Sequence, residues 1–183
     1  MRVHPRTLRG TALVMSLLAG CGRGPNELAA PAAIRVSSPG IAGGMLDRIY
    51  TCAGPGISPE VVWSAPPAGT RSLALVVTDL DSRFGYDFVH WVVYDIPASE
   101  RGLPAGFAAQ PHPPGGIERG RNDDDQQGYV PPCPPGGATH RYAFVVYALG
   151  TLVNAPGLSK PGLFAAIRDH VLAKGVMIGS GSH

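Results

Sequence analysis

The segment Gly128–Tyr142 limits the possible folds of this chain more than any other, because four of the five residues in Pro131–Pro135 are prolines. Each proline fixes φ near about −65° and removes a backbone N–H group. Such a segment can neither continue as a helix nor lie inside a sheet. It predicts a stiff loop that delivers His140 to the start of an apolar strand, Tyr142–Leu149. The alternative is a plain crossover between strands.

The chain has 183 residues, which fits one domain with a buried core. Its 25 glycines and 19 prolines separate apolar segments without any repeat, so they indicate turns between strands. A net charge of only +2 gives no reason to expect a nucleic acid as partner.

The N-terminus has the features of an export signal. A basic stretch, Arg2–Arg9, precedes an apolar stretch, Thr11–Leu18, that is too short to span a membrane. The following Leu18-Ala19-Gly20-Cys21 resembles a bacterial lipobox, in which cleavage occurs before the cysteine. We therefore expect residues 1–20 to be a lipoprotein signal peptide and Cys21 to carry the acyl chains that anchor the protein stably. The alternative is an ordinary secretory signal in which Cys21 falls near the cleavage site by chance.

The residues after the cysteine indicate where the protein is sorted. Gly22 stands where an aspartate would retain the protein in the inner membrane, so the expected location is the bacterial cell envelope, on the periplasmic side of the outer membrane. Residues 21–40 are rich in Ala, Pro, Gly and Ser and are expected to form a lipidated tether. The folded domain is then expected to span residues 41–183.

Hydrophobic patterning predicts a mostly β protein. Strands are expected at Met45–Tyr50, Val61–Trp63, Ser72–Thr78, Phe88–Ile96, Tyr142–Leu149 and Val176–Ile178. In the fourth of these, alternation puts Phe88, His90 and Val92 on one face and Trp91 on the other. One C-terminal helix is expected from a Ser159 cap to Gly175, with His170 packed on its apolar face.

The region Pro97–Gly128 is irregular and holds three successive carboxylates, Asp123–Asp125. Calcium ligands normally alternate along the chain and include a distant glutamate, so a solvated turn is the preferred interpretation over a cation site. The chain also lacks the tight His/Cys spacing of a metal site. No metal is therefore expected.

His90, His140 and Asp79 suggest an acid/base couple, a metal site or an anion site. An anion site is preferred, because it needs only N–H donors that face a cleft and a carboxylate that orients an imidazole. A hydrolase that uses Cys133 and His140 is less favoured, since nothing in the sequence near Cys133 indicates a lowered thiol pKa.

Several separated motifs carry a family resemblance. In order, they are Thr51-Cys52-Ala53-Gly54, Asp79-x-Asp81, His90-Trp91-Val92-Val93-Tyr94, Gly120-Arg121-Asn122-Asp123, Pro132-Cys133-Pro134-Pro135 and His140-Arg141-Tyr142. With them the chain resembles the phosphatidylethanolamine-binding protein (PEBP) family, and most closely its bacterial Raf kinase inhibitor-like (YbhB/YbcL) branch. The resemblance implies an antiparallel β-sandwich around one large central sheet, with an anion pocket at its edge. It implies neither catalysis nor a cofactor.

The resemblance also implies which residues bind the ligand. They are Asp79, Asp81, His90, Tyr129, Pro131, Pro132, Cys133, His140 and Tyr142. The implied ligand is a small phosphorylated anion or a phospholipid headgroup. An alternative function is inhibition or modulation of an envelope protease or kinase through the same surface.

This chain departs from the family at the pocket. Leu80 and Arg83 replace two prolines of the usual Asp-Pro-Asp-Ala-Pro, and Asp124 and Asp125 replace a phenylalanine and a glycine. We expect Arg83 to add a cation to the pocket.

Two cysteines, Cys52 and Cys133, remain after Cys21. Both lie in Gly/Pro-rich loops, and export to an oxidising compartment permits a disulfide between them. Two free thiols are the alternative, and the sequence leaves both open.

Overall fold

A computed structural model describes residues 27–110 and 113–182 of the chain. The predicted signal peptide and Cys21 lie outside these residues. The largest element is an eight-stranded sheet in the order β3-β4-β11-β10-β6-β7-β9, with β1 paired to β11. Its strands are β1 (Ala32–Ala33), β3 (Ile41–Ala42), β4 (Met45–Leu46), β6 (Ser72–Asp79), β7 (Phe88–Pro97), β9 (Glu118–Arg119), β10 (His140–Leu149) and β11 (Val171–Gly181). A second sheet consists of β2 (Val36–Ser37), β5 (Val61–Trp63) and β8 (Gly102–Leu103).

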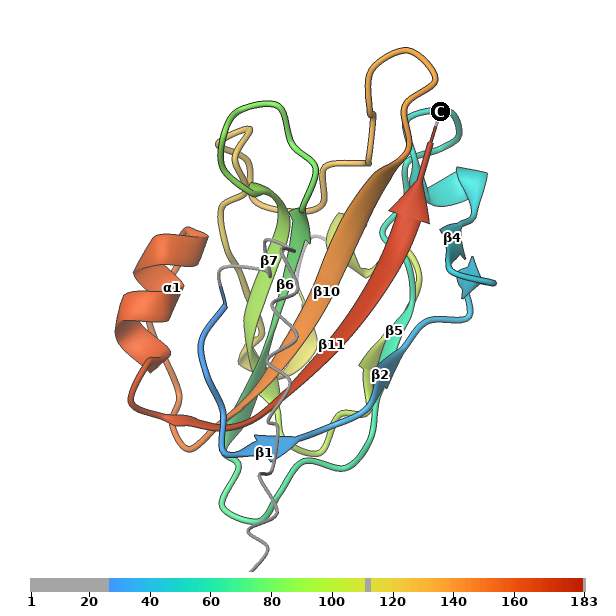
Figure 1. The fold of residues 1–183 in the computed structure, drawn as a ribbon. Coiled ribbons are helices and arrows are strands. Elements are labelled where there is room, and N and C mark those ends of the chain that lie inside the picture. Colours follow the sequence, from blue (N-terminus) through green and yellow to red (C-terminus); the bar gives the residue numbers. More distant parts are fainter. Residues whose placement is uncertain (1–26, 111–112, 183) are drawn as a thin grey trace, which may run out of the picture.

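The two sheets and one helix form layers. Figure 1 shows the three-stranded sheet on one side of the central strands and α1 (Lys160–Ile167) on the other. One apolar cluster lies between the sheets and includes Trp63, Trp91 and Phe144. A second lies under α1 and includes Tyr94 and Leu163. The prediction of a mostly β sandwich with a C-terminal helix is confirmed.

The central strands are buried on both faces. Every residue of β6 is buried, as are all of β10 except Arg141. Their nearly continuous apolar sequences predicted this, since a strand covered on both sides need not alternate with polar residues. The strand predicted over Met45–Tyr50 is only partly present. The chain turns after β4 into a short 3-10 helix, Arg48–Tyr50, whose first turn is capped by the Asp47 carboxylate.

The predicted helix is much shorter than expected. It ends at Ile167, and the Ser159 side chain makes no capping hydrogen bond. The residues from Val171 onward pair with β10 as strand β11, which continues well beyond the predicted Val176–Ile178. Gly175 does not end a helix but lets the N-terminal segment approach, because a Cβ there would lie 2.4 Å from the Ile34 carbonyl oxygen. His170 precedes the strand and is exposed, not packed in a core as predicted.

The folded region begins before the predicted boundary at residue 41. Strands β1 and β2 lie within the predicted tether, and Ile34 between them is buried in the core. Farther upstream, the Glu27 carboxylate binds Lys160 Nζ at 2.8 Å and accepts the Tyr147 hydroxyl. The described part of the tether is therefore packed against the domain.

A bulge in β7 changes the predicted faces of that strand. Val77 pairs with Trp91 and Thr78 with Val89, so His90 has no residue opposite it in β6. The extra residue interrupts the alternation. His90 therefore packs against Tyr142 of the inter-sheet cluster, whereas Val92 packs in the cluster under α1. The prediction that His90 and Val92 share a face is wrong, and the bulge is the reason.

Candidate anion-binding site

A cavity of about 250 Å³ opens at the end of the central sheet. The loop between β6 and β7 and the proline-rich loop before β10 meet at this end, which is the top of the molecule in Figure 1. The walls of the cavity contain five ionisable side chains, Asp79, Arg83, His90, Asp124 and His140. The remaining lining residues are Ser82, Phe84, Phe88, Val130, Pro131, Cys133, Pro134 and Pro135.

His140 is held by Asp79. The first residue of β10 and the last of β6 lie close together because Tyr142 pairs with Asp79 across these neighbouring strands. His140 Nδ1 lies 2.7 Å from Asp79 Oδ2, and both side chains are only 10% exposed. A carboxylate accepts hydrogen bonds, so Nδ1–H donates and Nε2 is the ring nitrogen available to a ligand. The other Asp79 oxygen accepts the Asp81 backbone N–H at 2.8 Å.

His90 is held by the proline-rich loop. Its Nδ1 lies 2.8 Å from the Val130 carbonyl oxygen, and the Val130 N–H donates to the His90 carbonyl oxygen at 2.9 Å. A carbonyl can only accept, so the proton of the neutral ring is on Nδ1 and Nε2 carries a lone pair. Burial lowers the pKa of His90, while the Val130 hydrogen bond and the carboxylates of Asp79, Asp124 and Asp123 act in the opposite direction.

A disulfide fastens the proline-rich loop to the rest of the domain. Cys52 and Cys133 are bonded, with their Cα atoms 5.3 Å apart. The Cys52 N–H also donates to the Pro132 carbonyl oxygen at 3.0 Å. The sequence had left free thiols as an alternative, and the structure shows the bridge. Because Cys133 lines the cavity, the bridge positions one of its walls.

The acidic segment forms a turn that brings Asp124 to the cavity. The Asn122 side chain is at its centre, because its oxygen accepts the N–H groups of Asp124 and Gln126 and its amide donates to the Gly128 carbonyl. Asp123 accepts the Val89 N–H at 2.8 Å, which ties the turn to β7. The predicted turn is present. Among the described residues, no group of three or more His, Cys, Asp or Glu side chains is placed to hold a metal ion.

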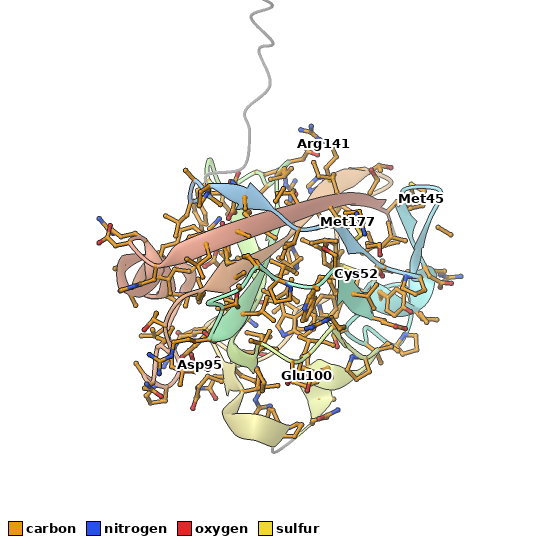
Figure 2. All side chains as sticks on the ribbon, turned by 90° about the horizontal axis from the view of Figure 1, so that it is seen from below. Met45, Cys52, Asp95, Glu100, Arg141 and Met177 are labelled. Carbon is orange, nitrogen blue, oxygen red and sulfur yellow. A yellow bond between two sulfur atoms is a disulfide. The ribbon has the colours of Figure 1, made fainter. Side chains whose placement is uncertain are left out.

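Asp81 supports the site from outside. Its carboxylate binds the Arg141 guanidinium through two hydrogen bonds of 2.9 and 2.7 Å, and it also accepts the Arg141 backbone N–H. These hydrogen bonds lower the pKa of Asp81. Figure 2 shows Arg141 at the outer edge of the packed side chains. Asp81 does not line the cavity but ties the β6–β7 loop to the start of β10.

Three other residues that the resemblance implied also lie behind the cavity walls. The Tyr142 ring packs against His90 with 5.3 Å between ring centroids. Tyr129 packs on Trp91, and its hydroxyl donates to the Tyr50 carbonyl at 2.9 Å. Pro132 is buried. These side chains position the lining residues and do not themselves form the wall.

The phenylalanines that line the cavity were missed from the sequence. Phe84 lies in the β6–β7 loop and Phe88 begins β7, next to His90. Alternation did place Phe88 on the face of His90, which was the available signal. No pattern in the sequence shows which way the loop around Phe84 folds. The contribution of Arg83 was expected, and it does line the cavity.

Within residues 27–110 and 113–182, no helix is both long and apolar enough to cross a membrane.

Comparisons with known proteins identify similar chains over most of the domain. A family model described as phosphatidylethanolamine-binding protein matches residues 36–181. The UPF0098 protein of Aquifex aeolicus is 41% identical over 137 residues, which cover 73% of this chain and 79% of that protein. YbhB of Escherichia coli is 42% identical over 97 residues, which cover 52% of this chain and 61% of that protein. The crystal structure of E. coli YbcL, described as a new member of the mammalian PEBP family, superposes with a TM-score of 0.75. Its identity is 30%, and the match covers 83% of this chain and 99% of that one.

Proposed function

Since this chain belongs to the phosphatidylethanolamine-binding protein family and resembles its YbhB/YbcL members, we propose that it is an exported lipoprotein that binds small phosphorylated anions or phospholipid headgroups. The ligand enters the cavity at the end of the central sheet. Members of this family are generally binding proteins, and we propose the same for this chain, without catalysis. The predicted acylation of Cys21 anchors it to the membrane of the cell envelope.

The observation that carries the proposal is the pairing of His140 with Asp79 inside a cavity that also contains Arg83. Asp79 accepts the hydrogen bond of His140 Nδ1 and so fixes the imidazole orientation, and the protonated ring donates from Nε2 to a phosphoryl oxygen. Arg83 supplies a guanidinium group to the same cavity. Asp124, on the same wall, suits a ligand that also carries an ammonium group, as an ethanolamine headgroup does.

The disulfide supports two parts of this proposal. Cys133 has no free thiol, so the cysteine hydrolase considered from the sequence lacks its nucleophile. Stable disulfides also form mainly in oxidising compartments, which fits export.

The proposal predicts that phosphate and phosphoethanolamine bind in the cavity. His140→Ala removes one donor and leaves the buried Asp79 without its imidazole partner, so we expect the affinity for both ligands to fall at least tenfold, as about 1.4 kcal/mol or more is lost. Isothermal calorimetry and phosphorus NMR of the intact protein in detergent measure this.

His170→Ala is the matched control, since His170 is exposed in the segment between α1 and β11 and lies outside the cavity. Equal affinities for the His140→Ala variant and the unchanged protein would refute the proposed site. Folding of each variant is checked by its near-ultraviolet circular dichroism.

A further inference from the structure

A series of rings in contact, edge-on at His90 and stacked between Phe84 and Tyr86, leads from the core through the cavity wall to the surface. Successive ring centroids are 5.3 Å apart from Tyr142 to His90, 4.9 Å from His90 to Phe88, 5.8 Å from Phe88 to Phe84 and 5.9 Å from Phe84 to Tyr86. The last two side chains are 67% and 58% exposed. They are the most exposed large apolar side chains of the described residues.

The exposed pair flanks a glycine that faces open space. Gly85 between them has φ of +79°, and a Cβ built there would meet nothing within 4 Å. The loop therefore projects away from the domain, next to Arg83 on the cavity wall. Isolated exposed apolar residues are ordinary, but an adjacent aromatic pair beside a binding cavity indicates a contact surface. Tyrosine favours the boundary between water and lipid, where its ring meets apolar groups and its hydroxyl polar ones. Phenylalanine is among the apolar side chains that insert at this boundary.

The described part of the chain begins close to this loop. Glu27 binds Lys160 Nζ at 2.8 Å, and Lys160 and Tyr86 line the same surface hollow of about 470 Å³. Figure 1 shows the first described residues beside α1. Cys21 precedes Glu27 by six residues (27 − 21 = 6). Six residues can span at most about 20 Å, so an anchor at Cys21 holds Glu27, and with it the aromatic loop, near the bilayer.

We propose that residues 83–86 dock on the surface of the phospholipid bilayer in which the protein is anchored. The rings of Phe84 and Tyr86 enter the headgroup region, Arg83 pairs with lipid phosphates, and the cavity faces the membrane. This inference rests on the lipid anchor of the proposed function, because the short connection to Cys21 identifies the bilayer as the occupant. It makes a headgroup in the same bilayer the ligand nearest to the cavity.

Tryptophan reporters test this orientation in the intact, processed protein. Trp63 and Trp91 are buried, with 5% and 0% exposure, so a new surface tryptophan is the one that lipid can reach. We would reconstitute Phe84→Trp in vesicles of phosphatidylethanolamine and phosphatidylglycerol, with and without bromine on the acyl chains. We expect its fluorescence to shift to shorter wavelength in vesicles and to be partly lost when the lipids are brominated. Tyr86→Trp is the second reporter.

Leu152→Trp is the matched control. Leu152 is 39% exposed and lies three residues after Leu149, the last residue of β10, at the end of the strand opposite to His140. Its anchor and vesicles are the same, so only its position differs. We expect bromine to cause no loss of its fluorescence.

The outcomes separate the two proposals. Vesicle flotation first shows whether the processed protein is anchored, and a chain that stays in solution would overturn both the lipoprotein function and the docking. A chain that floats, with Phe84→Trp and Tyr86→Trp quenched no more than Leu152→Trp, would overturn the docking alone. The docking would also be overturned if the fluorescence of the two loop reporters changed only on addition of a soluble protein or a soluble small molecule, and not in vesicles.

Discussion

At the scale of single residues, the site depends on how each imidazole is partnered. His140 binds a carboxylate, whereas His90 binds a backbone carbonyl and is buried among aromatic rings. Burial lowers the pKa of His90 from its ordinary value of 6.5. At neutral pH, therefore, His90 offers a ligand the lone pair of Nε2. His90 donates from Nε2 only after taking up a proton, which a bound anion favours.

The lowered pKa of His90 predicts a pH dependence of stability. The unfolded chain binds the proton at a higher pH than the folded one, so this contribution is complete above pH 6.5. It is lost as pH falls from 6.5 toward the lower folded pKa, by up to about 1.4 kcal/mol per pH unit. Urea unfolding between about pH 7.5 and 4.5, in buffer without phosphate, measures the slope. We expect a smaller slope for His90→Gln, and identical slopes would contradict this explanation.

At the scale of elements, the cavity exists because separate loops are fixed to strand ends. Prolines give the 131–135 loop few N–H donors, so two other contacts position it. One is the reciprocal pair of hydrogen bonds between Val130 and His90, and the other is the bridge from Cys133 to Cys52. On the opposite wall, the Asp81–Arg141 pair ties the β6–β7 loop to β10.

The disulfide is expected to stabilise the whole domain as well as the loop. It joins residues 81 positions apart, and closing a loop of that length is worth about 4 kcal/mol in the chain-entropy model. Cys52→Ser combined with Cys133→Ser should lower the free energy of unfolding by about this amount. Cys52→Ser alone should cost nearly the same, because either change breaks the bridge. Additive effects of the two single changes in urea unfolding would show that the bridge is not the cause.

At the scale of the whole molecule, the N-terminal segment is part of the fold. Strand β1 pairs with β11, and Lys174 Nζ donates to the Leu28 carbonyl at 2.8 Å. Glu27, Lys160 and Tyr147 bring together the start of the described chain, the helix and the central sheet. The Glu27 and Lys160 side chains are only 2% and 10% exposed. This cluster, which we call the N-terminal clasp, fixes the first described residue, Glu27, against the domain.

Breaking the clasp should destabilise the domain. Glu27→Ala leaves the buried Lys160 charge without its carboxylate, and we expect a loss of about 3 kcal/mol in the free energy of unfolding. Glu27→Gln combined with Lys160→Met removes both charges and should cost less. The control is Asp125→Asn, which breaks the exposed Arg121–Asp125 pair and should change stability by less than about 1 kcal/mol. A smaller loss for Glu27→Ala than for the control would contradict the role of the clasp.

The sequence alone determined the β class and the buried central strands. The family resemblance implied the pocket residues Asp79, His90, Pro131, Cys133 and His140, which line the cavity. Apolar runs and prolines act locally, so their effect is visible in the order of residues. Only the family resemblance connected the motifs that are separated in the sequence with one anion pocket.

Only the tertiary structure decided the remaining features. The apolar spacing after Ile167 predicted a continued helix, but residues from Val171 onward form strand β11 through hydrogen bonds with β10. Strand pairing depends on residues distant in sequence, so the spacing did not show it. The bulge at His90 likewise depends on its register with β6, and it turns that imidazole to the side of Tyr142. The packing of Glu27 against Lys160 joins residues 133 positions apart. Such contacts have no local signal, since each is fixed by the closure of the whole chain.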